Sequence, residues 1–353
     1  MLTLKNGLTI GHTEPTRVNC NIGCSRLSDY DKEIRKLHLI NESGILPDMM
    51  MDLSLVELDK PLYLSVRDDL GLPFGTVLSY QPFDKSIGLN WKRTKQHLLK
   101  LCNEGLSFVT IHYTADIDLF EEAKKIRKIP ITSRGGGIVL YDTVLNSRKQ
   151  NLFREYIDEI IDIVLEYDIV ISLGTTFRPG TILDACDYIH IEETKRQLDI
   201  CRYLQKRKVK VMVENVGHIS LDKLFTHAEL LRQFNAPIMP LGPLPTDIAV
   251  NEDHIANAIG STVAASMGVA HIINCISRYE HSNSDISADA TIEAIRSARI
   301  AAHIADITRN VPRAVLKEQL LTDIRASIHS CFADGTLCPR CSNVCPLKMF
   351  SDD

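Results

Sequence analysis

The sequence predicts an α/β fold, and a (β/α)8 barrel is the simplest arrangement of its segments. Short β-branched or apolar runs alternate with longer amphipathic stretches along most of the chain. These runs recur at intervals of roughly 25 to 40 residues, as the strands of successive β-α units do. Most of them are apolar in both alternating registers, which indicates strands that are covered on both faces. The alternative fold is an open, doubly wound sheet.

Nine runs have the composition of strands, one more than an eight-stranded barrel needs, and their patterns do not single out the surplus run. In chain order the runs are residues 18–22, 49–54, 75–80, 108–113, 130–136, 169–174, 209–215, 238–242 and 270–276. Helices are expected between them, where apolar residues recur with a period close to 3.6. The clearest helical segments are residues 148–166, 195–208, 221–234 and 288–308.

The composition is that of a globular protein and argues against several classes. The chain has 353 residues, of which 44% are hydrophobic and 24% are charged, and its net charge is -5. A mildly acidic chain is not expected to bind nucleic acid, which requires a basic face. No apolar run reaches the length of about 18 residues that a membrane span needs. The N-terminal stretch lacks the apolar core of a signal peptide, so we expect a cytoplasmic protein.

The ten cysteines are unevenly distributed, since four of them lie between Cys331 and Cys345. In a reducing compartment, dispersed cysteines are usually small buried hydrophobic residues, whereas a dense cluster is more often a metal site than a set of disulfides. We therefore expect a barrel domain over residues 1–309 and a tail over residues 310–353 that carries the cysteine cluster.

Cys338, Cys341 and Cys345 form the densest part of this cluster. Three thiolates at such spacing can hold a 4Fe–4S iron–sulfur cluster and leave one iron free for a small molecule, as radical chemistry from S-adenosylmethionine requires. The usual order for that chemistry is C-x3-C-x2-C, whereas this chain has C-x2-C-x3-C. In the alternative, Cys331 is a fourth ligand, which would give a closed cluster or a structural zinc.

Polar residues gather at the C-terminal ends of the expected strands, where barrel enzymes carry their chemistry. Asn21, Asp52, Tyr80 and His112 end the first four strands, although such residues can also cap the following helix. Residues 133–137, Ser-Arg-Gly-Gly-Gly, suit a phosphate or carboxylate, because glycines let backbone N–H groups approach an anion and arginine adds a bidentate charge. The alternative for this segment is a plain βα turn.

His218 and His281 also follow strand ends. Two neutral imidazoles with a carboxylate such as Glu214 nearby can hold a divalent metal and leave positions open for substrate. The alternative for each histidine is an ordinary hydrogen-bonded role. Asp253 is expected to cap a helix rather than to bind metal, and the role of Asp247 stays open.

Together these features resemble the phosphomethylpyrimidine synthase family of radical S-adenosylmethionine enzymes, which has a 5-hydroxybenzimidazole synthase paralogue. The resemblance runs from about Val18 to Lys348. It rests on stretches that occur in family order, among them VNCNIG at 18–23, MDLS at 51–54, TIH at 110–112, SRGG at 133–136, LGPLPTDIA at 241–249, YEH at 279–281 and AAHIAD at 301–306.

The resemblance implies a carbon–carbon lyase that converts 5-aminoimidazole ribonucleotide to the pyrimidine phosphate of thiamine. It also implies a 4Fe–4S cluster, S-adenosylmethionine, a divalent metal (zinc or iron), an external electron donor and a homodimer in which the tail reaches over the partner's barrel. Position by position, it implies substrate contacts at Asn21, Met51, Tyr80, His112, Ser133, Arg134, Gly135, Arg178 and Glu214, metal ligands at His218 and His281, and cluster ligands at Cys338, Cys341 and Cys345.

The chain departs from the family pattern in the pocket and in the tail. Thr175 stands where the family has Asp, Met239 stands where it has Tyr, and the last cysteine spacing is one residue shorter. An altered pocket is compatible with the thiamine pyrimidine or, as the alternative, with 5-hydroxybenzimidazole for the lower ligand of cobamides. A third interpretation is a non-catalytic relative that binds a cluster or zinc.

Overall fold

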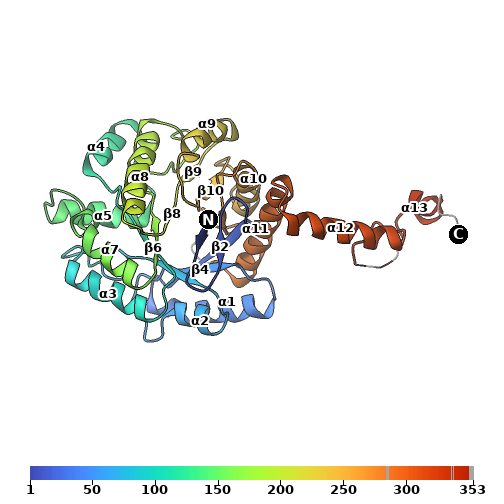
Figure 1. Ribbon diagram of the computed structural model, residues 1–353, viewed down its shortest axis with the longest axis horizontal. Helices are drawn as coiled ribbons and strands as arrows, with labels where there is room; N and C mark the ends of the chain where they lie inside the picture. Colours follow the sequence, from blue (N-terminus) through green and yellow to red (C-terminus); the bar gives the residue numbers. More distant parts are fainter. Residues whose placement is uncertain (284–285, 335, 337, 350–353) are drawn as a thin grey trace.

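A computed structural model of the chain describes residues 1–283, 286–334, 336 and 338–349, and its core is a curled parallel sheet (Figure 1). Seven strands pair in the order β11-β3-β4-β5-β6-β7-β8, and all six pairings are parallel. The strands are β3 (Arg17–Ile22), β4 (Met49–Asp52), β5 (Phe74–Val77), β6 (Phe108–Ile111), β7 (Val170–Leu173), β8 (Val211–Val213) and β11 (Ile272–Asn274).

The segment around Ile238 closes this sheet into a barrel. On one side, Val213 N donates to Pro237 O at 2.9 Å and Met239 N donates to Val213 O at 2.8 Å, which joins the segment to β8. On the other side, Ile272 N donates to Ile238 O at 3.2 Å, which joins it to β11. The segment therefore takes the eighth position between the edge strands, and the predicted barrel is confirmed.

Short β-structure covers each end of the barrel. Beyond the closing segment, β10 (Leu241–Leu244) pairs in parallel with β9 (Val216–His218). At the amino end, β1 (Leu2–Thr3) and β2 (Thr9–Ile10) form an antiparallel pair, and Arg17 and Lys210 donate to its carbonyls. Apolar side chains from this pair, from the barrel strands and from the segments beside them fill the barrel interior as one cluster. Its buried members are Leu2, Leu4, Ile10, Met49, Met51, Val77, Tyr80, Phe108, Val170, Met212, Met239 and Ile272.

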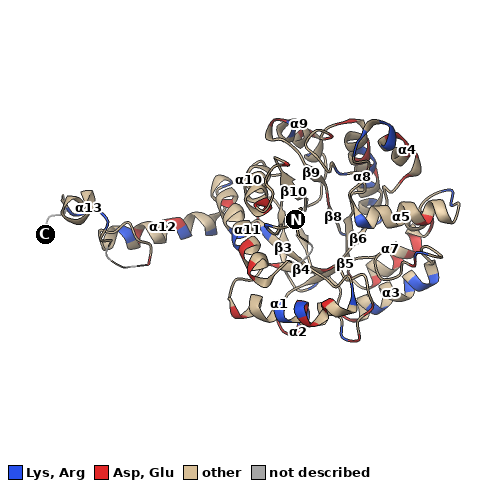
Figure 2. Cartoon of the chain, turned by 180° about the vertical axis from the view of Figure 1, so that it is seen from behind, with Lys and Arg blue, Asp and Glu red and all other residues tan. Residues whose placement is uncertain are grey.

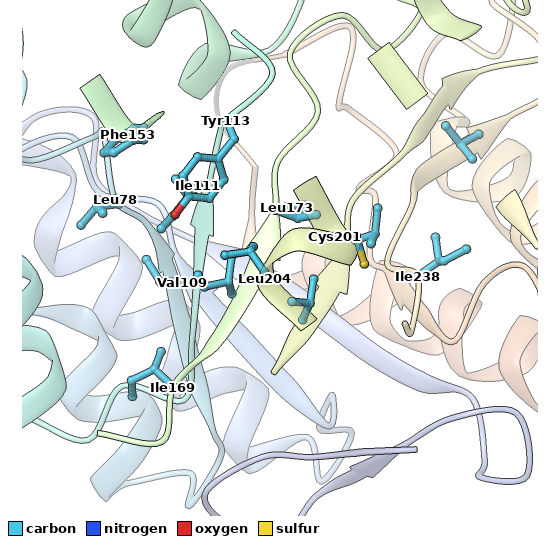
Figure 3. Packing of buried hydrophobic residues seen from close by; sticks show 14 of the residues in the cluster. Leu78, Val109, Ile111, Tyr113, Phe153, Ile169, Leu173, Cys201, Leu204 and Ile238 are labelled. Atoms are coloured by element: carbon cyan, nitrogen blue, oxygen red, sulfur yellow. The ribbon is translucent and has the colours of Figure 1, made fainter. Parts of the chain in front are cut away.

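Helices surround the sheet, and a second apolar cluster fills the space between the two (Figure 3). The helices are α1 (Tyr30–Glu42), α2 (Leu62–Asp68), α3 (Trp91–Asn103), α4 (Ile117–Ile126), α5 (Arg134–Leu145), α6 (Leu152–Glu155), α7 (Ile157–Glu166), α8 (Tyr188–Lys206), α9 (Leu221–Leu231), α10 (Asp253–Ser266) and α11 (Ala288–Thr308). Acidic and basic residues are interspersed along these helices (Figure 2). Among the described residues, no helix is long and apolar enough to cross a membrane.

The surplus strand of the sequence prediction is residues 130–136, and predicting a strand there was wrong. Ser133 is instead the N-cap of α5, because its hydroxyl accepts a hydrogen bond from Gly136 N. Residues 148–166 contain two helices, α6 and α7, rather than one, because the helical conformation is interrupted at Tyr156. The helix predicted over 195–208 begins earlier, at Tyr188, where the Asp187 side chain caps it. Helix α11 spans the predicted residues 288–308.

The tail leaves the barrel on helix α12 (Pro312–Ser327), which projects away from the other elements (Figure 1). Beyond it lie a short turn of 3-10 helix, Ser342–Val344, and α13 (Pro346–Met349). The predicted tail of 310–353 also includes residues 335, 337 and 350–353, which lie outside the described residues. The boundary at 309/310 therefore stays a prediction.

A buried ion network ties the first strand to the last helix of the barrel. The Asp306 carboxylate accepts from Thr16 N at 2.9 Å, from the Thr16 hydroxyl at 2.7 Å and from Arg309 at 2.7 Å. All three residues are largely buried. Removing the carboxylate would leave these donors unpaired, and a broken buried charge pair is costly.

We expect D306A to lower the free energy of unfolding by about 3–5 kcal/mol. The matched control is D199A, which removes the exposed partner of Arg202 and should change stability by less than about 0.5 kcal/mol. Urea denaturation of both variants measures the two effects, and equal stabilities would contradict the role given to Asp306.

Candidate active site

All barrel strands run the same way, so their carboxyl ends form a single mouth. The floor of this mouth is apolar. Met51 and Tyr80, two predicted substrate contacts, belong to the interior cluster together with Met239. Met239, where the resemblance leads us to expect a tyrosine, is completely buried and gives the floor an apolar side chain.

Asparagines join the first strand to the last at this level. Asn21 lies opposite Met51 in the β3–β4 pairing, and its Oδ1 accepts from Asn19 Nδ2 at 2.9 Å. Asn19 Nδ2 also donates to Asn274 Oδ1 in β11 at 2.6 Å, and Asn274 Nδ2 donates to Pro240 O in the closing segment. This network was not predicted, because its members are 255 residues apart in the chain.

His112 occupies a narrow space between two glycines. A Cβ on Gly135 would lie 2.3 Å from His112 Cε1, and a Cβ on Gly174 would lie 2.8 Å from the same ring. Ser133 Oγ lies 3.1 Å from Nε2, whereas Nδ1 is buried and has no hydrogen-bond partner among the residues that the structure describes. Burial, and then the positive charge of Arg178, lower the pKa of His112 to about 3, so the ring is neutral at ordinary pH.

Residues 133–137 act as a helix start that packs closely against the mouth. Because Gly135 has no side chain, the His112 ring can pack against it. Gly136 likewise leaves room for Thr176, since a Cβ there would lie 2.5 Å from the Thr176 side chain. These two glycines therefore have a packing role, beyond any approach of an anion. Arg134 is exposed, and its guanidinium lies 5.6 Å from the centroid of the Tyr80 ring. No hydrogen bond or ion pair of Arg134 occurs within the described part of the chain, which leaves it available for an anion.

Glu214 lies at the end of β8, where hydroxyls hold one of its oxygens. Oε1 accepts from Thr110 Oγ1 at 2.7 Å and from Ser172 Oγ at 3.3 Å. Burial raises the pKa of this carboxyl, while these hydroxyls and nearby Arg178 lower it. The second oxygen has no hydrogen bond among the described residues and is free to meet a ligand.

Thr175, which replaces the family's Asp, is turned into the barrel wall. Its hydroxyl donates to Glu214 O at 2.6 Å, and the side chain is buried. Arg178 donates to Thr175 O at 3.1 Å, while its Nε is buried without a partner. The loop after β7 is therefore fixed to β8 by a neutral contact at this position.

His218 and His281 come together at the mouth, with ring centroids 4.9 Å apart. Each ring is held by a carboxylate at Nδ1, since Asp247 Oδ1 lies 2.7 Å from that nitrogen of His218 and Asp253 Oδ1 lies 2.9 Å from that of His281. Burial lowers the pKa of His218, which favours the neutral ring. Carboxylates at Nδ1 are the usual support of metal-binding histidines, and they leave each Nε2 as the ligand atom.

Sequence reasoning did not identify the two aspartates as partners of the histidines. The N-cap of α10 is Glu252, so the expectation that Asp253 caps this helix was wrong. Asp253 is buried and its carboxylate also accepts from His281 N at 3.2 Å. No local pattern links either aspartate to its histidine, which lies 28 or 29 residues away in the chain.

The tail cysteines are all free thiols, as are the other six. Cys338 is half-buried, Cys341 is exposed and Cys345 is buried, while Cys331 is exposed. The three thiols of the triplet, all within the described part of the tail, are not gathered within ligand distance of one another. Three thiols in close sequence, with turns at Cys341 and Cys345, are nonetheless the donor set of an iron–sulfur cluster.

The barrel and the side chains at its mouth are those of an α/β-barrel enzyme. The chain belongs to the Radical SAM ThiC family, whose model matches residues 3–350. Membership of this family implies S-adenosylmethionine and an iron–sulfur cluster as cofactors.

The similar proteins include several that are named phosphomethylpyrimidine synthase. The one from Desulforamulus reducens is 34% identical over 89% of this chain and 74% of its own length. For the one from Ignicoccus hospitalis, the identity is 36% over 87% of this chain and 72% of the relative. Among solved structures, 7,8-dihydropteroate synthase from Vibrio fischeri matches with a TM-score of 0.45 and 11% identity, over 90% of this chain and 98% of that one.

The packing of α5 against His112 predicts different outcomes at neighbouring glycines. G135A should lower the free energy of unfolding by about 1–3 kcal/mol, because the new methyl group overlaps the imidazole. G137A is the control, since its Cβ would meet only Ile131 at 3.9 Å, and alanine in a helix should be neutral or stabilising by up to about 1 kcal/mol. Chemical denaturation distinguishes the two, and equal losses would contradict the close approach.

His112 should also make the fold sensitive to acid. Histidine in the unfolded chain has a pKa of about 6.5, so below that pH the unfolded chain binds a proton at residue 112, whereas His112 in the folded chain stays neutral. The free energy of unfolding therefore falls as the pH drops from about 6.5 towards about 3. We expect H112Q to flatten this fall by up to about 1.4 kcal/mol per pH unit. H38Q, at an exposed position, is the control and should follow the wild-type curve. Unfolding free energies between pH 4 and pH 7 provide the comparison, and parallel curves for wild type and H112Q would contradict the assignment.

Proposed function

We propose that the chain is a radical S-adenosylmethionine lyase that acts on 5-aminoimidazole ribonucleotide and forms the pyrimidine phosphate of thiamine. The observation that carries this proposal is the pair of histidines at the mouth, each oriented by an aspartate, the exposed Asp247 for His218 and the buried Asp253 for His281. A protein without chemistry at this mouth has no physical need for two imidazoles in that arrangement. The free cysteines of the tail, whose spacing suits an iron–sulfur cluster, and the family membership support the same conclusion.

Each part of the substrate meets a matching group of the mouth in this proposal. The guanidinium of Arg134 and the first N–H groups of α5 bind the phosphate, since a helix start and an unpaired arginine both favour an anion. The free oxygen of Glu214 and the unpartnered Nδ1 of His112 hydrogen-bond the aminoimidazole. Met51 and Met239 exclude water from the floor below it.

Cys338, Cys341 and Cys345 would hold the cluster, and His218 and His281 would hold a divalent metal, zinc or iron, through Nε2. When bound, the cluster and S-adenosylmethionine supply a 5′-deoxyadenosyl radical, the species that removes hydrogen from the substrate. The protein's own contribution is to orient the ribose and to keep water out, and an external donor provides the electron. Ten free thiols suit a reducing cytoplasm, where we place the protein.

The paralogous product, 5-hydroxybenzimidazole, is the second candidate, and two residues favour it. Thr175 bonds the backbone of Glu214 where the family has an acid, and Met239 joins the apolar floor where the family has a phenol. Neither side chain offers a polar group to a ligand, because the Thr175 hydroxyl is used by Glu214 O and Met239 is apolar. A pocket with fewer polar groups at its floor would make fewer hydrogen bonds to the substrate while its carbon skeleton rearranges.

The apolar surface of the tail helix supports a homodimer. Leu316, Leu320 and Ile324 lie four residues apart on α12 and are each about half exposed, at 53%, 54% and 46%. Ile300 and Ile304 are exposed on the adjoining α11. Apolar side chains aligned in this way mark an interface. Because α12 carries the thiols away from their own barrel, we propose that they serve the mouth of the partner (Figure 1).

Anaerobic reconstitution with iron and sulfide tests the proposed function. We expect about four iron and four sulfide per chain, formation of 5′-deoxyadenosine with 5-aminoimidazole ribonucleotide, and a product whose mass identifies it as the pyrimidine or the benzimidazole. C341A should lose the cluster and the product, whereas C331A, at the undecided neighbouring cysteine, should keep both.

Two outcomes would contradict this. One tightly bound zinc without sulfide would indicate the non-catalytic relative. A complete cluster that yields no 5′-deoxyadenosine with any imidazole ribonucleotide would exclude the proposed substrate class.

A further inference from the structure

A cavity of about 400 Å³ lies at the amino end of the barrel, on the side opposite the mouth. Its wall is built by the N-terminal pair β1–β2, the turn from α8 into β8, the residues before the closing segment, and the residue before β11. The N-terminus lies near the centre of the barrel in Figure 1. This volume is in the range of small-molecule sites, about 300–1,000 Å³. The cavity shares no lining residue with the mouth, so a ligand there would occupy a separate site.

The charged part of the cavity wall is basic. Lys208 and Lys210 line it together with His12 and His271, and none of the described residues that line it is acidic. Lys210 is paired with Asp168, which lies outside the lining, at 2.7 Å. Lys208 is exposed and makes no ion pair within the part of the chain that the structure describes. One ammonium group at this cavity is therefore left to meet an anion.

Two histidines orient a hydrogen-bond donor at the cavity. The backbone N–H of Ile238 donates to His271 Nδ1 at 3.0 Å, so the ring proton of His271 lies on Nε2. That nitrogen lies 3.3 Å from His12 Nδ1, and the two rings meet edge to face with centroids 4.4 Å apart. His271 therefore donates to His12. This assignment, inferred from the hydrogen bonds, puts the ring proton of His12 on Nε2.

The exposed His12 residue is held from two sides. Arg309 donates to its carbonyl oxygen at 2.9 Å, and its ring rests against the buried His271. Burial, and then the neighbouring basic groups His12 and Arg309, lower the pKa of His271 to about 3, so His271 carries one ring proton at ordinary pH. His12 Nε2 has no hydrogen bond among the described residues. A donor that is already fixed in place loses little conformational entropy when it binds a ligand.

Apolar side chains form another part of the wall, with Leu2, Phe234 and Pro237 among them. Gln205 Nε2 donates to Asn235 O at 2.6 Å, which joins the end of α8 to the loop before the closing segment. Ligand sites typically combine apolar contacts with a few oriented polar groups. A wall with a basic part and an apolar part suits a ligand that has an anionic group and an apolar body.

From this arrangement we infer a binding site for a small organic phosphate, in which Lys208 and His12 hold the phosphate and the apolar side chains contact the rest of the ligand. Lysine binds phosphate as a point charge, and an imidazole N–H adds a directed hydrogen bond. The hydrogen bonds that orient His12 begin at Ile238 N, in the segment that closes the barrel. A ligand on His12 would therefore stabilise the closed barrel, and this role does not depend on the proposed substrate.

Calorimetric titration of the full chain with phenyl phosphate tests this inference. The background is R134A, which lacks the arginine proposed to bind phosphate at the mouth. We expect one saturable site with millimolar or tighter affinity, and a rise in the unfolding temperature on addition of the ligand. Inorganic phosphate should bind more weakly, because it has no apolar body to contact the wall.

Added to this background, K208A and H12A should each weaken phenyl phosphate binding by about tenfold or more, because each removes a charge-assisted contact. K206A is the matched control, since Lys206 is an exposed lysine at the end of the same helix and lies outside the lining, and it should bind as the background does. Circular dichroism establishes that each variant is folded. Absence of saturable binding in the background, or undiminished binding in K208A or H12A, would overturn the inference.

Discussion

The parallel closure of the sheet through Ile238 is the constraint on which the rest of the molecule depends. Backbone hydrogen bonds join this short segment to β8 on one side and to β11 on the other, and Ile238 forms a parallel β-bridge with Val213. Closure with all strands parallel brings every carboxyl end to one rim. Groups that are far apart in the chain, such as Asn19 and Asn274 or His218 and His281, therefore meet there. The interior below is filled by apolar side chains, so within the barrel the rim is the place where a ligand can meet polar groups.

The polar groups of the rim are held in position by hydrogen bonds from residues that lie behind them. Glu193 is buried in α8 and accepts from Thr176 N and Phe177 N, which fixes the loop after β7. Burial raises the pKa of Glu193 to about 7, against the lowering effect of these hydrogen bonds. Asp247 and Asp253 do the same for the two histidines.

Much of the barrel could be predicted from the sequence, because strands covered on both faces are apolar in both registers. Residues 130–136 were misassigned for a local reason. Glycines there look like a strand end, but Ser133 caps a helix and two of the glycines admit His112 and Thr176. The histidine pair and the position of Arg134 could be anticipated from strand ends. Their aspartate partners could not, since a carboxylate oriented by tertiary contacts carries no local pattern.

Isotope transfer from the substrate tests the account most directly. The reconstituted chain would be incubated with 5-aminoimidazole ribonucleotide carrying deuterium on the ribose, and the 5′-deoxyadenosine would be examined by mass spectrometry. If the rim holds this ribose against the radical source, deuterium appears in 5′-deoxyadenosine. Formation of unlabelled 5′-deoxyadenosine from ribose deuterated at every carbon, in a chain with a full cluster, would contradict the placement of substrate at the barrel mouth.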